Sequence, residues 1–95
     1  MRLEIADEAL AEAADAQHRY AVIDAALGRD FADAINAALR RIAEEPLLYQ
    51  SLTPSARRCI LPRFPFSVVY QIRSDAIRVI AVMHQARRPG YWRGR

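Results

Sequence analysis

The residues of this chain that are best suited to chemistry are arginines, and they gather in its last third. Residues 57–95 contain nine arginines and one acid, Asp75, so this segment carries about +8. The guanidinium group is planar and always charged, and it fits phosphate oxygens and stacks on flat rings. The composition therefore predicts a concentrated cationic surface that attracts polyanions.

The first 56 residues have the opposite charge. Five arginines there face ten acids, so this part carries about −5, and the two parts together give the net charge of +3. All 14 basic residues are arginines. Genome composition explains the absence of lysine better than function does, but it does not explain the segregation. The charge pattern indicates a nearly neutral scaffold that carries a basic binding surface.

Few side chains of the basic segment could move protons. Arginine stays protonated, so it stabilises negative charge but is a poor acid or base. His84 and Tyr91 remain as candidate proton carriers, because Asp75 is expected in a turn. The two histidines and the single cysteine, Cys59, are scattered, which predicts neither a metal site nor an internal disulfide. No glycine-rich phosphate loop is present, so we expect no cofactor.

Length and composition indicate what kind of protein carries these residues. The 95 residues are enough for one domain, and a hydrophobic share of 53% predicts a folded core, not a disordered chain. No apolar run is long enough to span a membrane, and the first ten residues lack the apolar stretch of a signal peptide. We therefore expect a single domain, residues 1–95, in the cytoplasm.

Two amphipathic helices are expected in the first half. The first covers residues 8–27, with Asp7 as its N-cap and Gly28 as its stop. The second follows a cap at Asp30 and ends before Pro46, with apolar residues every three or four positions. The short link between them predicts an antiparallel helix hairpin.

Four strands are expected around this hairpin. They cover residues 1–5, 57–63, 66–73 and 76–84, whereas residues 46–56 have the composition of a loop. Alternation in the last two strands predicts one apolar face for the helices, made by Phe66, Val68, Tyr70, Ile72, Ile77, Val79, Ala81 and Met83. The other face is expected to be open and mixed, with Val69, Ile80 and Val82 among Arg73, Arg78 and His84.

The fold class that follows is α+β with the order β-α-α-β-β-β. In it, an antiparallel helix hairpin packs on one face of a small, mainly antiparallel sheet.

The quoted residues resemble a known family. The segment RRCILPRFPFSVVYQIRSDAIRVIAVMHQARRPGYWRGR is similar to the C-terminal half of the ParE/RelE toxins of bacterial type II toxin–antitoxin systems. The N-terminal strand, the DEALAEAADA helix and the proline after the second helix resemble the family too. The resemblance implies the same fold and a cognate antitoxin. An acidic, amphipathic segment of that antitoxin would suit the open sheet face.

The resemblance also implies two activities that one fold cannot separate. RelE-like members cut messenger RNA on the ribosome, and this activity would use Arg63 and Arg73 for charge stabilisation and His84 or Tyr91 for proton transfer. The lysines common in RelE-like sites are absent here. A harmless, partner-binding member of the family is a third alternative.

ParE-like members inhibit DNA gyrase by binding, and the ending AVMHQARRPGYWRGR is closer to these. The resemblance then assigns target or antitoxin binding to Arg57, Arg58, Arg78, Arg87, Arg88 and Trp92. Structural roles compete with these assignments. His84 could cap its strand, and Tyr91 and Trp92 could fold back over the edge of the sheet.

Overall fold

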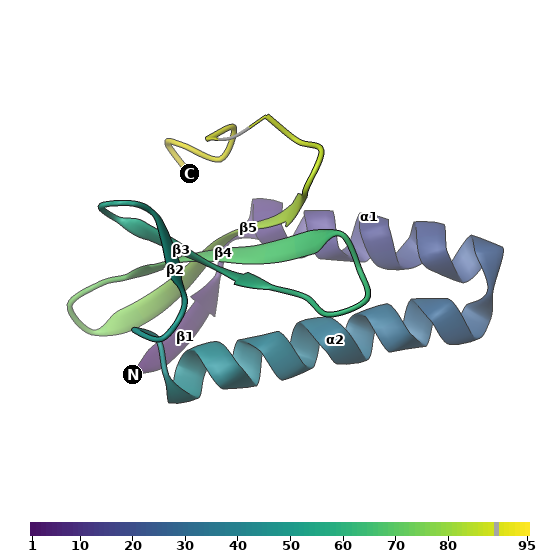
Figure 1. Ribbon diagram of the computed structural model, residues 1–95, viewed down its shortest axis with the longest axis horizontal. Coiled ribbons are helices and arrows are strands. Elements are labelled where there is room, and N and C mark those ends of the chain that lie inside the picture. Colours follow the sequence, from purple (N-terminus) through teal and green to yellow (C-terminus); the bar gives the residue numbers. More distant parts are fainter. Residues whose placement is uncertain (89) are drawn as a thin grey trace.

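Seven elements follow one another in the order β-α-α-β-β-β-β (Figure 1). The computed structural model describes residues 1–88 and 90–95, so Pro89 of the ARRPGYW motif lies outside the described residues. The elements are β1 (Arg2–Ile5), α1 (Asp7–Ile23), α2 (Ala25–Glu44), β2 (Gln50–Thr53), β3 (Ala56–Ile60), β4 (Phe66–Ile72) and β5 (Ala76–His84). The expected α+β class, the helix hairpin and the four expected strands are confirmed.

The strands form one sheet in the order β1-β5-β4-β3-β2. β1 is parallel to β5 and the other pairs are antiparallel, so the expected, mainly antiparallel sheet is present. The expectation of a loop over residues 46–56 was wrong for β2. This strand is short and lies at the edge, and its pairing of Gln50 with Arg58 overrides a Ser/Thr/Pro-rich composition that favours turns.

The sequence pattern placed the boundary between the two helices at residues 28–30, which is too far along the chain. α1 ends at Ile23 and α2 begins at Ala25, because the side chain of Asp24 accepts a hydrogen bond from Ala26 N at 2.9 Å and caps α2. Asp30 and Gly28 are therefore inside α2. At the other end of the hairpin, Asp7 opens the first turn of α1. The N-cap there is Ala6, which makes no side-chain cap bond.

Gly28 serves the approach of the two helices. It is buried, and a Cβ atom added to it would lie 2.7 Å from Cβ of Ala21 and 3.0 Å from Cα of Ala21. Contacts this short require a shift of backbone, so glycine allows the tight crossing of α1 and α2. A glycine that looked like a helix stop is thus a packing residue.

We expect Gly28→Ala to destabilise the protein although alanine is the better helix former. The clash should cost about 1–3 kcal/mol, against roughly 1 kcal/mol gained in helix propensity. The melting temperature, followed by circular dichroism, should fall by several degrees. In an Ala21→Gly background the same substitution should cost distinctly less. A higher melting temperature for Gly28→Ala alone would contradict this role.

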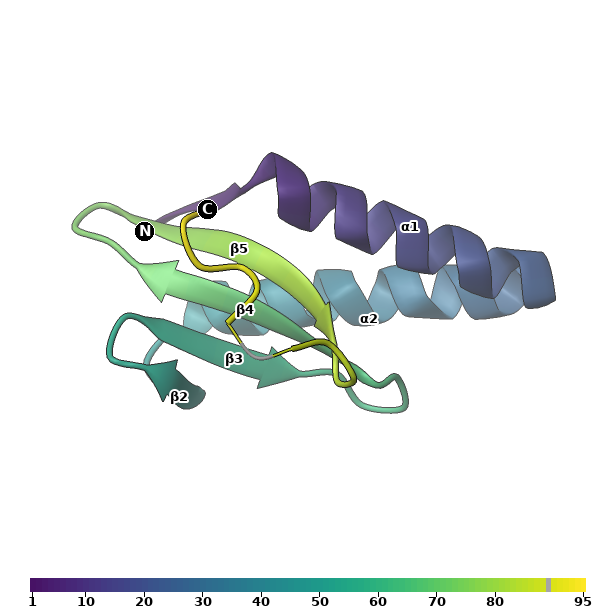
Figure 2. The same cartoon turned by 90° about the horizontal axis from the view of Figure 1, so that it is seen from above.

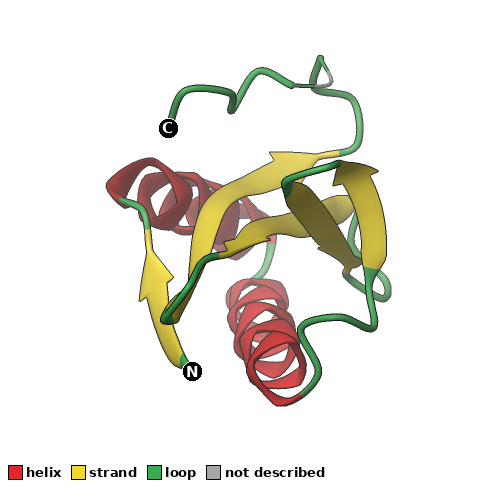
Figure 3. Cartoon of the chain, turned by 90° about the vertical axis from the view of Figure 1, so that its left-hand side faces the viewer, coloured by secondary structure: helices red, strands yellow, loops and turns green. Residues whose placement is uncertain are grey.

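The sheet separates two layers of buried side chains. α2 lies under one face, α1 runs alongside β5, and the C-terminal tail crosses the opposite face (Figures 1 and 3). The largest buried side chains on the helix side are Phe31, Ile42, Val68, Tyr70, Ile77 and Val79. The second, smaller cluster consists of Ala56, Val69, Ile80, Ala81, Met83 and Trp92.

A bulge in β5 changes which side chains face the helices. Val69 pairs with Ala81 and Tyr70 pairs with Val79, so Ile80 is an extra residue on β5. The simple alternation expected from the sequence therefore fails after Val79.

The bulge corrects four assignments. Ala81 and Met83, expected on the helix face, belong to the second cluster. Val82, expected on the open face, lies in the helix-side core. His84 packs edge-on against Phe66 with ring centroids 5.0 Å apart, so it also turns away from the expected open face. That face is not open, because the tail covers it.

Among the described residues, no helix combines the length and apolarity needed to cross a membrane.

Candidate functional site

The C-terminal tail, residues 85–88 and 90–95, folds back over the sheet face that the helices leave uncovered (Figure 3). Trp92 is its anchor, with 4% of its surface exposed against Val69, Ile80 and Met83. Tight turns shape the tail, with Arg93 N donating to Gly90 O at 3.0 Å. The tail therefore has a defined position from which it can present side chains.

Glu12 of α1 is the polar anchor of this tail. Its carboxylate accepts hydrogen bonds from the Tyr91 hydroxyl at 2.6 Å, Arg95 Nη1 at 2.8 Å and the backbone N of Val82 at 3.1 Å. Burial, followed by the hydrogen bond to Glu12, raises the pKa of Tyr91 to about 12. The phenol of Tyr91 is thus held in its protonated form.

Three arginines surround a cavity on this face, which we call the arginine cavity. It has a volume of about 210 Å³, and Arg58, Arg87 and Arg93 line it together with Met83 and Trp92. Its other lining residues are Leu52, Thr53, Ser67, Gln85 and Gly90. No acid lines the cavity among the described residues. The cavity therefore combines an apolar floor with three cations from β3 and the tail.

Neighbouring residues help to position each of these cations. Arg58 Nε donates to Gln50 Oε1 at 3.0 Å across β3 and β2. The guanidinium of Arg87 lies 3.8 Å from the centroid of the Tyr91 ring, which is a cation–π distance. The backbone N of Arg93 donates to Gly90 O at 3.0 Å in a turn, and the φ of 80° at Gly90 is a conformation that favours glycine. The chemistry suited to this arrangement is recognition of anionic groups beside an aromatic surface.

The other residues proposed for binding lie elsewhere. Arg57 Nη1 donates to the carbonyls of Tyr49 at 2.7 Å and Leu47 at 3.2 Å, so it ties β3 to the segment after α2. Arg78 pairs in register with Glu4 and Gln71, toward the opposite end of β5 from His84. Arg88 is exposed at the start of the tail. Of the six binding candidates, the arginine cavity brings together Arg58, Arg87 and Trp92.

The four residues proposed for RNA cleavage are not brought into one site. Arg63 lies before β4 and pairs with Asp30 of α2 at 3.6 Å, whereas Arg73 lies after β4 and donates to Gln71 at 2.9 Å. The seven residues of β4 separate them by roughly 20 Å.

The two proton-carrier candidates of that set have structural partners. Nδ1 of His84 accepts the backbone N–H of Ala86 at 2.9 Å. The Tyr91 hydroxyl donates to Glu12. Each group is therefore already engaged within the fold.

Two residues of the site were not identified from the sequence. Arg93 was counted among the basic residues of the last third but not singled out, and Glu12 was counted only among the ten acids of the first 56 residues. A signal for Glu12 existed: it lies three residues after Ala9 and four before Ala16, both of which are buried. A charged residue within the buried stripe of a helix indicates a partner.

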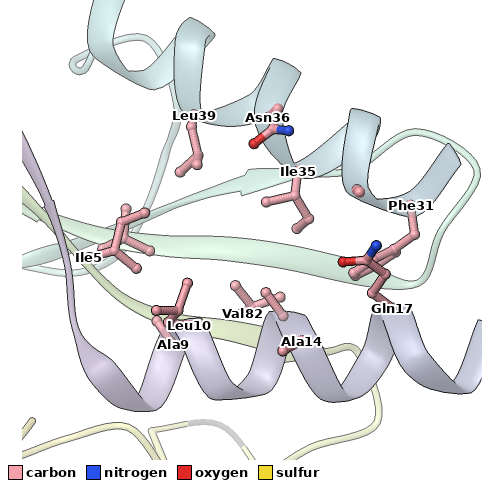
Figure 4. A pocket seen from close by; sticks show the side chains of 13 residues that line it. Ile5, Ala9, Leu10, Ala14, Gln17, Phe31, Ile35, Asn36, Leu39 and Val82 are labelled. Atoms are coloured by element: carbon pink, nitrogen blue, oxygen red, sulfur yellow. The ribbon is translucent and has the colours of Figure 1, made fainter. Parts of the chain in front are cut away.

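A second cavity, apolar in character, lies between α1 and α2 (Figure 4). It has a volume of about 230 Å³, and Leu10, Ile35, Leu39 and Val82 point into it. Leu10 is 58% exposed. We call this the helix groove. Small alanines of α1, such as Ala14, leave the space into which a partner's side chain could fit.

Among residues 1–88 and 90–95, no cluster of three or more His, Cys, Asp or Glu side chains could hold a metal ion.

Comparison with known proteins gives a family match from the sequence and a fold match from the structure. Residues 3–89 match the family described as ParE toxin of type II toxin–antitoxin system, parDE. A solved chain described as the chromosomal ParDE TA system from P. aeruginosa superposes with a TM-score of 0.66 at 18% identity, over 88% of this chain and 95% of that one. At 18% identity, this structural similarity shows a shared fold alone. A search of curated proteins finds no match. Since the family match spans nearly the whole chain, the protein belongs to the ParE toxin family of type II toxin–antitoxin systems.

Proposed function

We propose that this toxin inhibits DNA gyrase by binding it through the arginine cavity and the tail, and that a cognate antitoxin neutralises it. The observation that carries the proposal is the gathering of Arg58, Arg87 and Arg93 beside Trp92. Guanidinium groups next to an aromatic surface recognise carboxylates and phosphates and can contribute to the core of an interface. The toxin would inhibit gyrase by non-covalent binding, without catalysing a reaction.

The chemistry of the site favours binding over RNA cleavage. A nuclease needs an acid and a base beside the cations that stabilise the phosphorane. Tyr91, whose pKa is raised to about 12, stays protonated at neutral pH, and its hydroxyl is engaged with Glu12. The arginines of the cavity are protonated as well. This leaves charge recognition as the activity that the cavity supports best.

The antitoxin would use a different surface from the sheet face that the sequence suggested. That face carries the tail, with Trp92 buried there. The helix groove offers an apolar surface instead, lined by the exposed Leu10, the partly buried Leu39 and the buried Ile35 (Figure 4). Apolar side chains on one face of an antitoxin segment would fill this groove. We place both proteins in the cytoplasm, where gyrase works.

A supercoiling assay tests the proposal. Purified toxin, free of antitoxin, should prevent gyrase from supercoiling relaxed plasmid or should trap cleaved DNA, and added antitoxin should restore activity. If the toxin leaves gyrase unaffected, the proposal fails. Codon-phased cuts in messenger RNA after induction would then support a ribosome-dependent nuclease. Unimpaired growth of cells expressing the toxin alone would support a harmless binding protein.

A further inference from the structure

The edge of β5 is only partly covered by its neighbouring strand. β1 pairs with β5 as far as Val79, and Ala6 N donates to Val79 O at 2.8 Å where the chain turns into α1. Ile80 and Val82 lie beyond the last residue of β5 that pairs with β1. Unpaired edge groups of this kind require partners.

Both groups find their partners in the clasp formed by Glu12 and Arg95. Glu12 accepts the N–H of Val82 at 3.1 Å, and Arg95 Nη1 donates to Ile80 O at 3.1 Å and to Glu12 at 2.8 Å. Tyr91, 79 residues from Glu12 in the chain, adds its hydroxyl at 2.6 Å. Figure 2 shows the C-terminal end of the chain over β5, close to β1.

The polar anchoring of the tail converges on one carboxylate. Among the described residues, Trp92 Nε1 is buried and has no hydrogen-bond partner, so the indole holds the tail by apolar packing. Glu12 and Arg95 side chains are each 18% exposed, which shields their ion pair from solvent. Charge-assisted bonds in such surroundings are stronger than exposed ones. Without Glu12, Arg95 and Tyr91 would both lose their main partner.

The same clasp sets the position of the arginine cavity. Glu12 fixes the Tyr91 ring, over which the guanidinium of Arg87 lies at 3.8 Å. Trp92 follows Tyr91 directly and lines the cavity, as does Arg93. Two of the three cations of the cavity therefore depend on the path of the tail. Arg58 does not, because it belongs to β3.

We infer that Glu12 is a positioning residue of the toxin: it clasps the C-terminal tail against β5 so that Arg87 and Arg93 are held in place for the target. The part of this inference that concerns target binding rests on the proposed function. The part that concerns the tail does not, and it can be measured alone. Glu12 acts through Tyr91 and Arg95 and does not line the arginine cavity.

Trp92 makes the clasp directly measurable, since it is the only tryptophan of the chain. In full-length Glu12→Ala we expect red-shifted Trp92 emission and increased quenching by acrylamide, because the tail detaches. Gyrase inhibition should weaken at least about tenfold, while helix content by circular dichroism stays unchanged. Glu12→Gln keeps an acceptor for Tyr91 and Val82 but loses the ion pair, so its emission and inhibition should be intermediate.

Asp15→Ala is the matched control. It also removes one negative charge from α1, but Asp15 pairs only with the exposed Arg19, at 3.0 Å, among the described residues. Its emission and inhibition should equal those of the wild type. Tyr91→Phe provides a milder second variant if Glu12→Ala folds poorly, and a smaller red shift is expected from it.

Three results separate the tail's attachment from its role in binding. Unchanged Trp92 emission in Glu12→Ala and Tyr91→Phe would overturn the clasp. Shifted emission with undiminished gyrase inhibition would overturn the positioning role. Shifted emission in a protein whose wild type does not inhibit gyrase would support the clasp and refute the proposed function.

Discussion

Replacing Phe31 with alanine is expected to cost about 3–5 kcal/mol of folding free energy, which is the usual range for a large aromatic side chain removed from a core. Phe31 is fully buried. Its ring centroid lies 5.3 Å from Tyr20, 5.3 Å from Phe64 and 5.2 Å from Phe66. These neighbours come from α1, from the loop before β4 and from β4, so Phe31 of α2 joins both helices to the sheet.

The loss of folding free energy should lie high in this range. Phe31 borders the helix groove, so its removal would enlarge an existing space that the surrounding side chains cannot easily fill. A domain of this size has a total stability of only about 5–15 kcal/mol. Urea denaturation followed by circular dichroism measures the change. Val22→Ala is the control, since Val22 is 73% exposed and should change stability by less than about 0.5 kcal/mol. A loss below about 1 kcal/mol for Phe31→Ala would contradict this role of Phe31 in the core.

Neutralising the arginine cavity should abolish gyrase inhibition without unfolding the toxin. In the triple variant Arg58→Gln, Arg87→Gln, Arg93→Gln, each lost charged hydrogen bond to the target would be worth roughly 1.5 kcal/mol or more. Together they predict that at least about 100 times more toxin is needed to stop supercoiling. The melting temperature should change little, because Arg87 and Arg93 are exposed and Arg58 is partly exposed.

A second triple variant separates the site from the net charge. Arg2→Gln, Arg29→Gln, Arg40→Gln also removes three positive charges, but from exposed positions of β1 and α2. It should inhibit gyrase as the wild type does. Equal losses in both variants would mean that general charge, and not the arginine cavity, governs the inhibition.

The sequence predicted the parts of the fold that depend on local pattern. Apolar spacing in residues 31–42 and alternation in residues 66–73 and 76–84 are local signals, and the corresponding α2, β4 and β5 are present. The break between the helices was misplaced because Gly28 is as typical of a helix end as of a close helix crossing. The two roles are distinguished only by the tertiary contact, since a Cβ atom added to Gly28 would lie 2.7 Å from Cβ of Ala21.

The site depended on features that the sequence does not display. The extra residue Ile80 in β5 reversed the faces of the residues after it, and no turn or glycine marks such a bulge. The charge pattern of the sequence was enough to identify the arginines of the tail as candidate binding residues. Their arrangement required Glu12, which is 79 residues from Tyr91. Long-range pairing of this kind follows from tertiary structure, so it could not be predicted from composition or periodicity.

Binding of gyrase through the arginine cavity is the step on which the proposed action of the toxin depends. Calorimetric titration of purified gyrase with the toxin tests this step without relying on a downstream readout. We expect saturable binding of the wild type and of the Arg2/Arg29/Arg40 control, and at least about 100-fold weaker binding of the Arg58/Arg87/Arg93 variant. No binding by the wild type, or equal binding by all three proteins, would contradict it.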